Sequence, residues 1–355
     1  MQEQKSKASL RLFVKTLIIS AGAMLLVVGI GWLVISSTVR PPDIPVIAAS
    51  APFQVEAGDG PFEDAYIDAD DELLPPRLLQ FEERKPMFFT FLIFGLTEGL
   101  NANTIMVAAY DAQAGQAYIV SIPRDTMVDV QRGSRKIVSA YPVGLLHGGG
   151  MEGGVDRMKY EVSTLIGFRP DFYVRIDYEA FTRLVDAVGG VEIYVPFHMY
   201  YRDPFQDLHI DLQPGLQTLD GEDALLFSRY RTGTRGISPT ISDYQRIEHQ
   251  QQVLAAAAGQ LLTPASILRI PEFASIFNDH VYTNLALGEL LWFGNEARGI
   301  GGMDALSLYT LPMLGTSGAP SWYELADEEG ILELINRTIN PFVRDITSED
   351  LRIVN

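Results

Sequence analysis

The apolar run from Phe88 to Gly95 constrains the fold of this chain more than any other feature. All of its residues are uncharged, and four of them are phenylalanines. A continuous apolar run of strand length, enriched in aromatic side chains, is typical of a strand that is covered on both faces. We therefore expect this segment to be a central strand of the sheet on which the domain is built.

The segments after this run alternate between strand and helix patterns. Two apolar runs, Thr104 to Ala109 and Gln116 to Ser121, flank turn residues and predict a β-hairpin. Further on, apolar residues recur at helical spacing before the stop signal Gly189-Gly190. This alternation predicts an α/β fold with a central mixed β-sheet flanked by helices. The other expected elements are strands over 171–176, 191–195 and 306–311 and helices over 153–166, 181–188, 243–262 and 327–338.

An uncharged segment, Thr16 to Ile35, precedes this domain. About 20 apolar residues match the roughly 30 Å hydrocarbon core of a bilayer, and the basic tip at 1–15 belongs in the cytoplasm by the positive-inside bias. We expect one transmembrane helix over 16–39, with the rest of the chain extracellular at the cell membrane. A cleaved signal peptide is the alternative, but its apolar region is shorter, and the small residues at 48–51 come late for a cleavage site.

Charge and cysteine content narrow the functional classes. The chain has no cysteine and a formal net charge of −18, so it has no disulfides, and a nucleic-acid partner is not expected. A bacterial envelope protein fits both properties. Residues 40–86 are rich in proline and acidic residues and predict an extracellular stalk. The main domain then covers 87–262, and a C-terminal extension packed on it covers 263–355.

Arginines stand out against this acidic background at four positions. Arg124 follows a predicted strand and a proline, so we expect its side chain at a strand end, where α/β sheets usually bind ligands. Arg229 and Arg231 alternate in a segment predicted to be extended, and Arg246 lies one turn into the next helix. Guanidinium groups offer paired donors and stay charged, so the pattern predicts a phosphate-binding site. The alternative for Arg124 is a surface ion pair with a neighbouring aspartate.

Three further observations bear on such a site. Asp243 either belongs to it or is a favourable charge at a helix N-terminus. The apolar residues of the helices either form ordinary core or line a tunnel for an acyl or prenyl chain. The histidines show no pair at the spacing of a zinc site, so we interpret them as structural. They are His147, His198, His209, His249 and His280.

Several segments, taken in order, resemble the LytR-CpsA-Psr family. They are Phe91 to Gly95, Ser121 to Asp125, Lys136-Ile137 with Ala140-Tyr141, Val185 to Val191, Leu219 to Gly221 with Ala224-Leu225, Arg229 to Arg231, and Asp243 to Gln250. Their order and spacing match over roughly residues 88–262. The tail after this region is similar to one that many members carry.

The resemblance implies a membrane-anchored phosphotransferase of the cell envelope. Such an enzyme moves a glycopolymer from undecaprenyl pyrophosphate onto a peptidoglycan muramic-acid hydroxyl, so its implied partners are the polyprenyl-linked glycopolymer, peptidoglycan and the membrane. The residues that match the family's pyrophosphate-binding arginines are Arg124, Arg229, Arg231 and Arg246. The resemblance implies that these four arginines and Asp243 are catalytic, and that Gln250 and Lys136 also bind the pyrophosphate.

The resemblance also implies a magnesium or manganese ion, and here the chain departs from the family. Thr97 and Asn103 stand where the family has metal-binding aspartates. Neutral side chains should bind magnesium weakly unless Glu98 takes part. Three hypotheses for function remain, and the first two are a working or altered glycopolymer transferase and an impaired scaffold or regulator that binds polyprenyl phosphate. A purely structural cell-wall protein is a third.

Overall fold

The computed structural model describes residues 40–44, 82–97, 99–130, 134–205, 208–261, 269–296, 305–317 and 322–354. The predicted membrane span and most of the predicted stalk lie outside these residues. Within the described ranges, no helix has the length and apolar character needed to cross a bilayer. The chain divides into two units. The smaller, Met1–Asp43 with Ala286–Glu296, contains helix α8 (Leu287–Glu296), and the larger carries every other element discussed below.

The larger unit is built on a six-stranded mixed sheet in the order β10-β3-β2-β1-β4-β9. Strand β1 (Phe88–Leu96) lies inside it, antiparallel to β2 (Ala102–Asp111) and parallel to β4 (Phe172–Ile176). The expected central strand and the α/β class are confirmed. Strand β3 (Gln116–Ser121) completes the expected hairpin with β2. The edge strands β9 (Val281–Thr283) and β10 (Leu306–Thr310) come from the predicted C-terminal extension.

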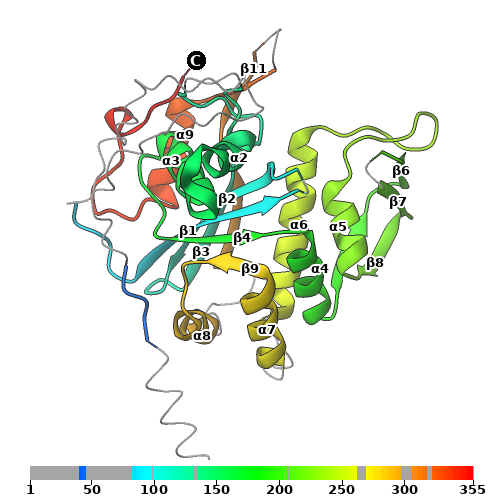
Figure 1. Ribbon diagram of the computed structural model, residues 1–355, viewed down its shortest axis with the longest axis horizontal. Coiled ribbons are helices and arrows are strands. Elements are labelled where there is room, and N and C mark those ends of the chain that lie inside the picture. Colours follow the sequence, from blue (N-terminus) through cyan, green and yellow to red (C-terminus); the bar gives the residue numbers. More distant parts are fainter. Residues whose placement is uncertain are drawn as a thin grey trace, which may run out of the picture. The chain divides into compact units, whose positions relative to one another are not determined.

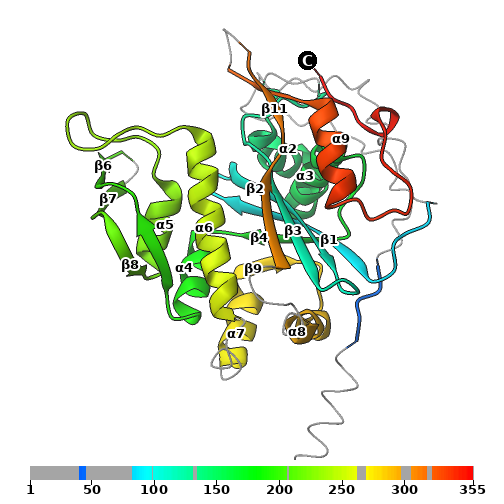
Figure 2. The same ribbon diagram turned by 180° about the vertical axis from the view of Figure 1, so that it is seen from behind.

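Helices cover both faces of this sheet (Figures 1 and 2). Helices α2 (Ala140–Gly144), α3 (Gly150–Ile166) and α9 (Glu328–Arg337) lie on one side. Helices α4 (Tyr178–Ala187), α5 (Gly221–Arg229) and α6 (Asp243–Leu261) lie on the other, and α7 (Ile270–His280) contacts α4.

The alternation of β1 assigns its side chains to these two layers. Leu92 and Phe94 are fully buried in a core shared with α3 and α9. Ile93 and Gly95 point the other way and line a cavity on the side of α4, α5 and α6. One strand therefore supplies both the main core and the floor of the cavity.

The predicted strand at 191–195 is present but does not join the main sheet. It is β5 (Val191–Val195), which pairs with β8 (Gly215–Leu219), while β6 (Met199–Asp203) pairs with β7 (Leu208–Leu212). Their apolar sides form a second core with α5 and α6. A further small sheet joins β11 (Met313–Thr316) to β12 (Glu324–Ala326).

Aspartates begin the helices that flank the cavity. The Asp177 carboxylate accepts a hydrogen bond from the Ala180 amide at 2.8 Å, and Asp220 accepts one from Asp223 at 2.9 Å. These caps start α4 and α5 directly after extended residues. The last residue of α5 is Arg229, so this arginine ends a helix instead of lying in the extended segment that its alternation with Arg231 suggested.

Candidate functional site

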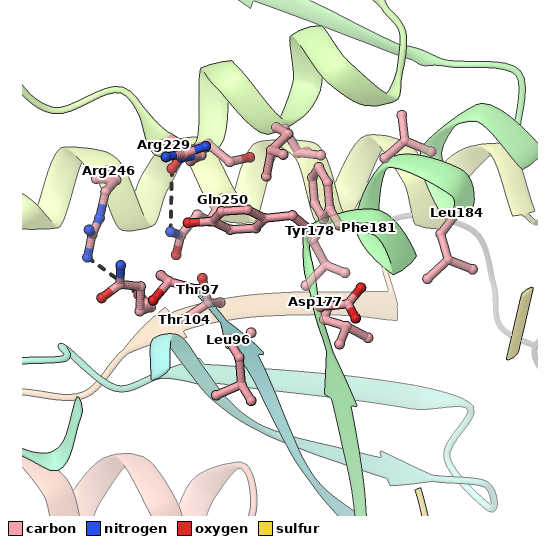
Figure 3. A pocket seen from close by; sticks show the side chains of 18 of the residues that line it. Leu96, Thr97, Thr104, Asp177, Tyr178, Phe181, Leu184, Arg229, Arg246 and Gln250 are labelled. Carbon is pink, nitrogen blue, oxygen red and sulfur yellow. Dashed lines mark hydrogen bonds between the residues drawn. The ribbon is translucent and has the colours of Figure 1, made fainter. Parts of the chain in front are cut away.

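A cavity of about 820 Å³ lies between the sheet and the layer formed by α4, α5 and α6. Figure 3 shows Arg229, Arg246 and Gln250 at one end and Phe181 and Leu184 towards the other. Its volume falls in the range of about 300–1,000 Å³ that is usual for ligand pockets. Much of the lining is apolar, as the tunnel alternative in the sequence required. The apolar lining residues include Ile93, Met106, Ile176, Leu184, Val188, Leu225, Val253, Leu254 and Leu261.

All four predicted arginines line this cavity. Arg124 follows the end of β3, where the Pro123 carbonyl accepts hydrogen bonds from the Thr126 amide and hydroxyl and turns the chain. Arg229 and Arg231 lie at and just beyond the end of α5, and Arg246 lies in the first turn of α6. Three separate segments thus bring their guanidinium groups to one end of one cavity.

Asp243 is the carboxylate around which these arginines gather. Its Oδ1 lies 2.9 Å from Arg246 Nη2, 3.6 Å from Arg124 Nε and 3.9 Å from Arg231 Nε. Its side chain is 13% exposed, and that of Arg246 is 6% exposed. A favourable charge at a helix N-terminus would not account for three guanidinium neighbours, so Asp243 belongs to the arginine cluster.

The cluster is poorly neutralised by the protein itself. Burial lowers the pKa of Arg246 to about 10; the charges of Arg124 and Arg231 act in the same direction, and Asp243 opposes them. The Nε groups of Arg124 and Arg246 are buried and have no hydrogen-bond partner among the described residues. Buried donors with excess positive charge favour an anion with several acceptor oxygens.

The two remaining predicted site residues differ in position. Gln250 lines the cavity, and its Nε2 donates to the Ser228 carbonyl at 3.5 Å. Lys136 is not among the lining residues: its Nζ lies 2.9 Å from Asp125 and 6.0 Å from the ring centre of Tyr323. The structure therefore places Lys136 beside the arginine cluster, away from the cavity in which the family resemblance put it.

The residues at the expected metal position do not fit a divalent cation. Asn103 Oδ1 accepts a hydrogen bond from Arg124 Nη1 at 3.0 Å, and the Asn103 carbonyl accepts one from Arg246 Nη2 at 3.5 Å. A cation at Asn103 would have to displace two guanidinium groups. Thr97 lines the cavity with a neutral hydroxyl, and no group of three acidic or histidine residues in the described ranges is placed to hold a metal. Glu98 lies outside those ranges.

Some residues of the site were not found from the sequence. Tyr178 lines the cavity beneath Arg229, whose guanidinium carbon lies 4.6 Å from the centre of its ring. Gln251 fixes α6 against the sheet, because its Nε2 donates to Ser121 Oγ at 3.0 Å and to the Tyr309 carbonyl at 2.9 Å. Tyr178 lies three residues before the helix predicted at 181–188 and gave no signal of its own, because its partner Arg229 is 51 residues away in sequence.

His249 supports the structural interpretation of the histidines. It is 6% exposed and packs on the Phe227 ring at a centroid distance of 4.4 Å. Burial lowers its pKa to about 4, with a hydrogen bond to the Phe227 backbone acting in the opposite direction. His249 is therefore neutral at physiological pH and takes no part as a charged ligand.

This lowered pKa predicts an acid-sensitive fold. The unfolded chain binds a proton at His249 near its ordinary pKa of 6.5, whereas the folded chain binds it only near 4. Stability is therefore lost as the pH falls from about 6.5 towards 4, by about 2 kcal/mol at pH 5. Urea unfolding of His249→Gln should show a flatter pH dependence over this window than the wild type. The exposed His209→Gln variant should keep the wild-type slope, and an unchanged slope in His249→Gln would contradict the assignment.

Comparison with known proteins identifies the family to which the sequence of this chain is similar. The model of the LytR_cpsA_psr family matches residues 83–339. A protein of Oceanobacillus iheyensis, named polyisoprenyl-teichoic acid–peptidoglycan teichoic acid transferase TagU, is 31% identical over 191 residues, which are 53% of this chain and 55% of that protein. The regulatory protein MsrR of Staphylococcus aureus is 26% identical over 52% of this chain and 51% of its own. The chain thus matches about half the length of these curated relatives.

A solved structure supports the fold. The crystal structure of Bacillus subtilis TagV aligns with a TM-score of 0.57 and 23% sequence identity, covering 70% of this chain and 95% of that chain. At this level of identity the similarity bears on the architecture alone.

Proposed function

The chain belongs to the LytR-CpsA-Psr family, and we propose that it is a membrane-anchored phosphotransferase of the cell envelope. In this proposal it transfers a glycopolymer from a polyprenyl diphosphate lipid to a hydroxyl of peptidoglycan. The supporting observation is the arginine cluster at one end of an apolar cavity, because a lipid diphosphate joins an anionic head to an apolar chain in the same way. The name of TagU points to the same reaction class.

In the proposed reaction the arginines stabilise charge at phosphorus. Phosphoryl transfer needs little covalent help from a protein, and guanidinium groups aimed at the phosphate oxygens supply most of the catalytic effect. The Nε donors of Arg124 and Arg246, which make no hydrogen bond among the described residues, are the groups we assign to those oxygens. Asp243 orients the guanidinium groups, since its Oδ1 is within 3.9 Å of three of them.

The proposed transfer does not pass through a divalent cation. Asn103, which stands at an expected metal-ligand position, is instead hydrogen-bonded by the guanidinium groups of Arg124 and Arg246. Positive charge at the diphosphate then comes from arginine. The Asp243 carboxylate already contacts three guanidinium groups, so it is unsuited to hold a divalent cation as well.

A second candidate is a scaffold or regulator that binds polyprenyl diphosphate without consuming it. The neutral residues Thr97 and Asn103 favour it, and one relative, MsrR, is named a regulatory protein. The two candidates share the binding site and differ only in turnover.

The full-length protein in detergent micelles, mixed with a radiolabelled lipid diphosphate glycan and peptidoglycan, separates these candidates. We expect labelled peptidoglycan together with an equal amount of polyprenyl monophosphate. Lipid diphosphate that is bound and stays intact would select the scaffold. No binding of the lipid at all would reject both candidates.

A further inference from the structure

Glu324 lies beside the arginine cluster although it comes from the far end of the chain. Strand β12 brings it there, because its amide donates to the Asp125 carbonyl at 3.0 Å and its carbonyl accepts from the Met127 amide at 2.9 Å. Thr126 and Glu324 form a parallel bridge. The backbone of Glu324 is thereby fixed to the segment that directly follows Arg124.

The carboxylate of Glu324 points to the first turn of α6. Its Oε2 accepts a hydrogen bond from the Tyr244 hydroxyl at 3.1 Å. Tyr244 follows Asp243, the carboxylate that binds Arg124, Arg231 and Arg246. Glu324 is therefore linked to the cluster through Tyr244, the sequence neighbour of Asp243, and its side chain is half-buried.

Three carboxylates, those of Asp125, Asp243 and Glu324, lie near the first turn of α6. Asp125 and Asp243 both form ion pairs with arginine or lysine. Asp243 contacts three guanidinium groups, and Asp125 lies 2.9 Å from Lys136 Nζ and 4.0 Å from Arg124 Nε. Glu324 forms no ion pair with any arginine or lysine in the described ranges. Among these three acids, Glu324 is therefore the one whose carboxylate is not paired with a cation in the described ranges.

The surroundings also raise the proton affinity of Glu324. Burial raises its pKa, the charges of Asp243 and Asp125 act in the same direction, and the hydrogen bond from Tyr244 opposes them. Burial likewise raises the pKa of Tyr244, so its hydroxyl keeps its proton and donates a hydrogen bond to Glu324. Lys136 contacts Asp125 and lies over the ring of Tyr323, the residue that precedes Glu324. A carboxylate with raised proton affinity is a stronger base than an ordinary glutamate.

We propose that Glu324 takes the proton of the acceptor hydroxyl, and that Tyr244 is the residue that positions its carboxylate. The inference rests on the proposed function, which needs such a base because an alcohol is a weak nucleophile. The acceptor oxygen forms a bond to the phosphorus that carries the glycopolymer, and its proton passes to Glu324. The bond from that phosphorus to the bridging oxygen breaks, and polyprenyl monophosphate leaves with the bridging oxygen. Glu324 then returns the proton to solvent.

The test compares the transfer kinetics of Glu324→Gln and Tyr244→Phe in the full-length protein. Loss of a general base costs about 10²–10⁴-fold in rate, so Glu324→Gln should lower kcat by about 100-fold or more while the affinity for the lipid diphosphate stays the same. Wild-type kcat should fall as the pH drops through the pKa of Glu324, because only the ionised carboxylate accepts a proton. This acid limb should vanish in Glu324→Gln. In Tyr244→Phe it should move to higher pH, since the lost hydrogen bond favours the ionised form.

Glu333→Gln is the matched control, because Glu333 is an exposed glutamate of α9 with a side chain 78% exposed. It should transfer at the wild-type rate. Wild-type kcat and an unchanged acid limb in Glu324→Gln would overturn the role of Glu324 while the proposed function stands. So would a loss of donor binding in parallel with kcat, which would make Glu324 part of the donor site. Absence of transfer by the wild type would overturn the proposed function and the role of Glu324 with it.

Discussion

Replacing Arg124 with alanine is expected to lower the rate of glycopolymer transfer by about a thousandfold, the effect of losing an arginine that stabilises a transferring phosphoryl group. Arg124 lines the cavity, donates to Asn103 Oδ1 at 3.0 Å and has a buried Nε that lies 3.6 Å from Asp243 Oδ1 without a hydrogen bond among the described residues. The rate of transfer from a radiolabelled lipid diphosphate, measured with the full-length protein, tests this expectation.

Two further variants make the Arg124 result specific. Arg124→Lys keeps the charge but loses the planar pair of donors, so we expect a rate between those of the wild type and Arg124→Ala. Arg183→Ala removes an arginine of α4 that is 51% exposed and pairs with Glu179, and it should leave the rate unchanged. A rate for Arg124→Ala equal to that of Arg183→Ala would remove Arg124 from the site.

Replacing Asp243 with alanine is expected to destabilise the fold by about 3–5 kcal/mol, because removal of one partner leaves the buried charge of its neighbour uncompensated. Arg246 is that neighbour, with a side chain 6% exposed and 2.9 Å from Asp243 Oδ1. Its pKa is already lowered by burial and by the charges of two other arginines. Urea unfolding monitored by circular dichroism measures this loss.

Inorganic pyrophosphate should partly rescue the Asp243→Ala variant. The added anion supplies the negative charge that the aspartate provided, so it should raise the unfolding midpoint of this variant more than that of the wild type. The control is Asp156→Ala, which breaks an ion pair with Arg169 at an aspartate that is 58% exposed and should cost less than about 1 kcal/mol. An unfolding midpoint for Asp243→Ala equal to that of Asp156→Ala would contradict the central position of Asp243.

Much of the fold could be predicted because its signals are local. The uninterrupted apolar run at β1 indicated a strand with two covered faces, and the turn residues after β2 indicated a hairpin. The spacing of Asp243 and Arg246 placed both on one turn of α6, and the structure brings them to 2.9 Å. Each of these inferences depends on residues that are close together in the chain.

Partner choice between distant segments could not be predicted in the same way. The pattern of β5 identifies a strand, but nothing in it says that the strand pairs with β8 outside the main sheet. Lys136 was grouped with the cavity by resemblance, whereas its ion pair with Asp125 draws it to the surface beside the cluster. The contact of Glu324 with Tyr244 spans eighty residues and depends on how β12 docks on the segment after Arg124.

The cavity itself also lay beyond sequence reasoning. Leu184, Val253 and Leu254 have the same helical spacing whether they fill a core or line a tunnel. The outcome depends on how far α4, α5 and α6 stand from the sheet, and the spacing of apolar residues along a helix does not encode that distance.

Binding of farnesyl diphosphate by the full-length protein in excess EDTA, measured by isothermal titration calorimetry, tests the arginine site most directly. Guanidinium groups alone should hold the diphosphate, so we predict the same affinity in EDTA and in magnesium. Farnesyl monophosphate should bind at least about tenfold more weakly, a difference of ~1.4 kcal/mol, because it offers fewer oxygens to the cluster. Binding that appears only with magnesium, or equal affinity for the two lipids, would contradict the account.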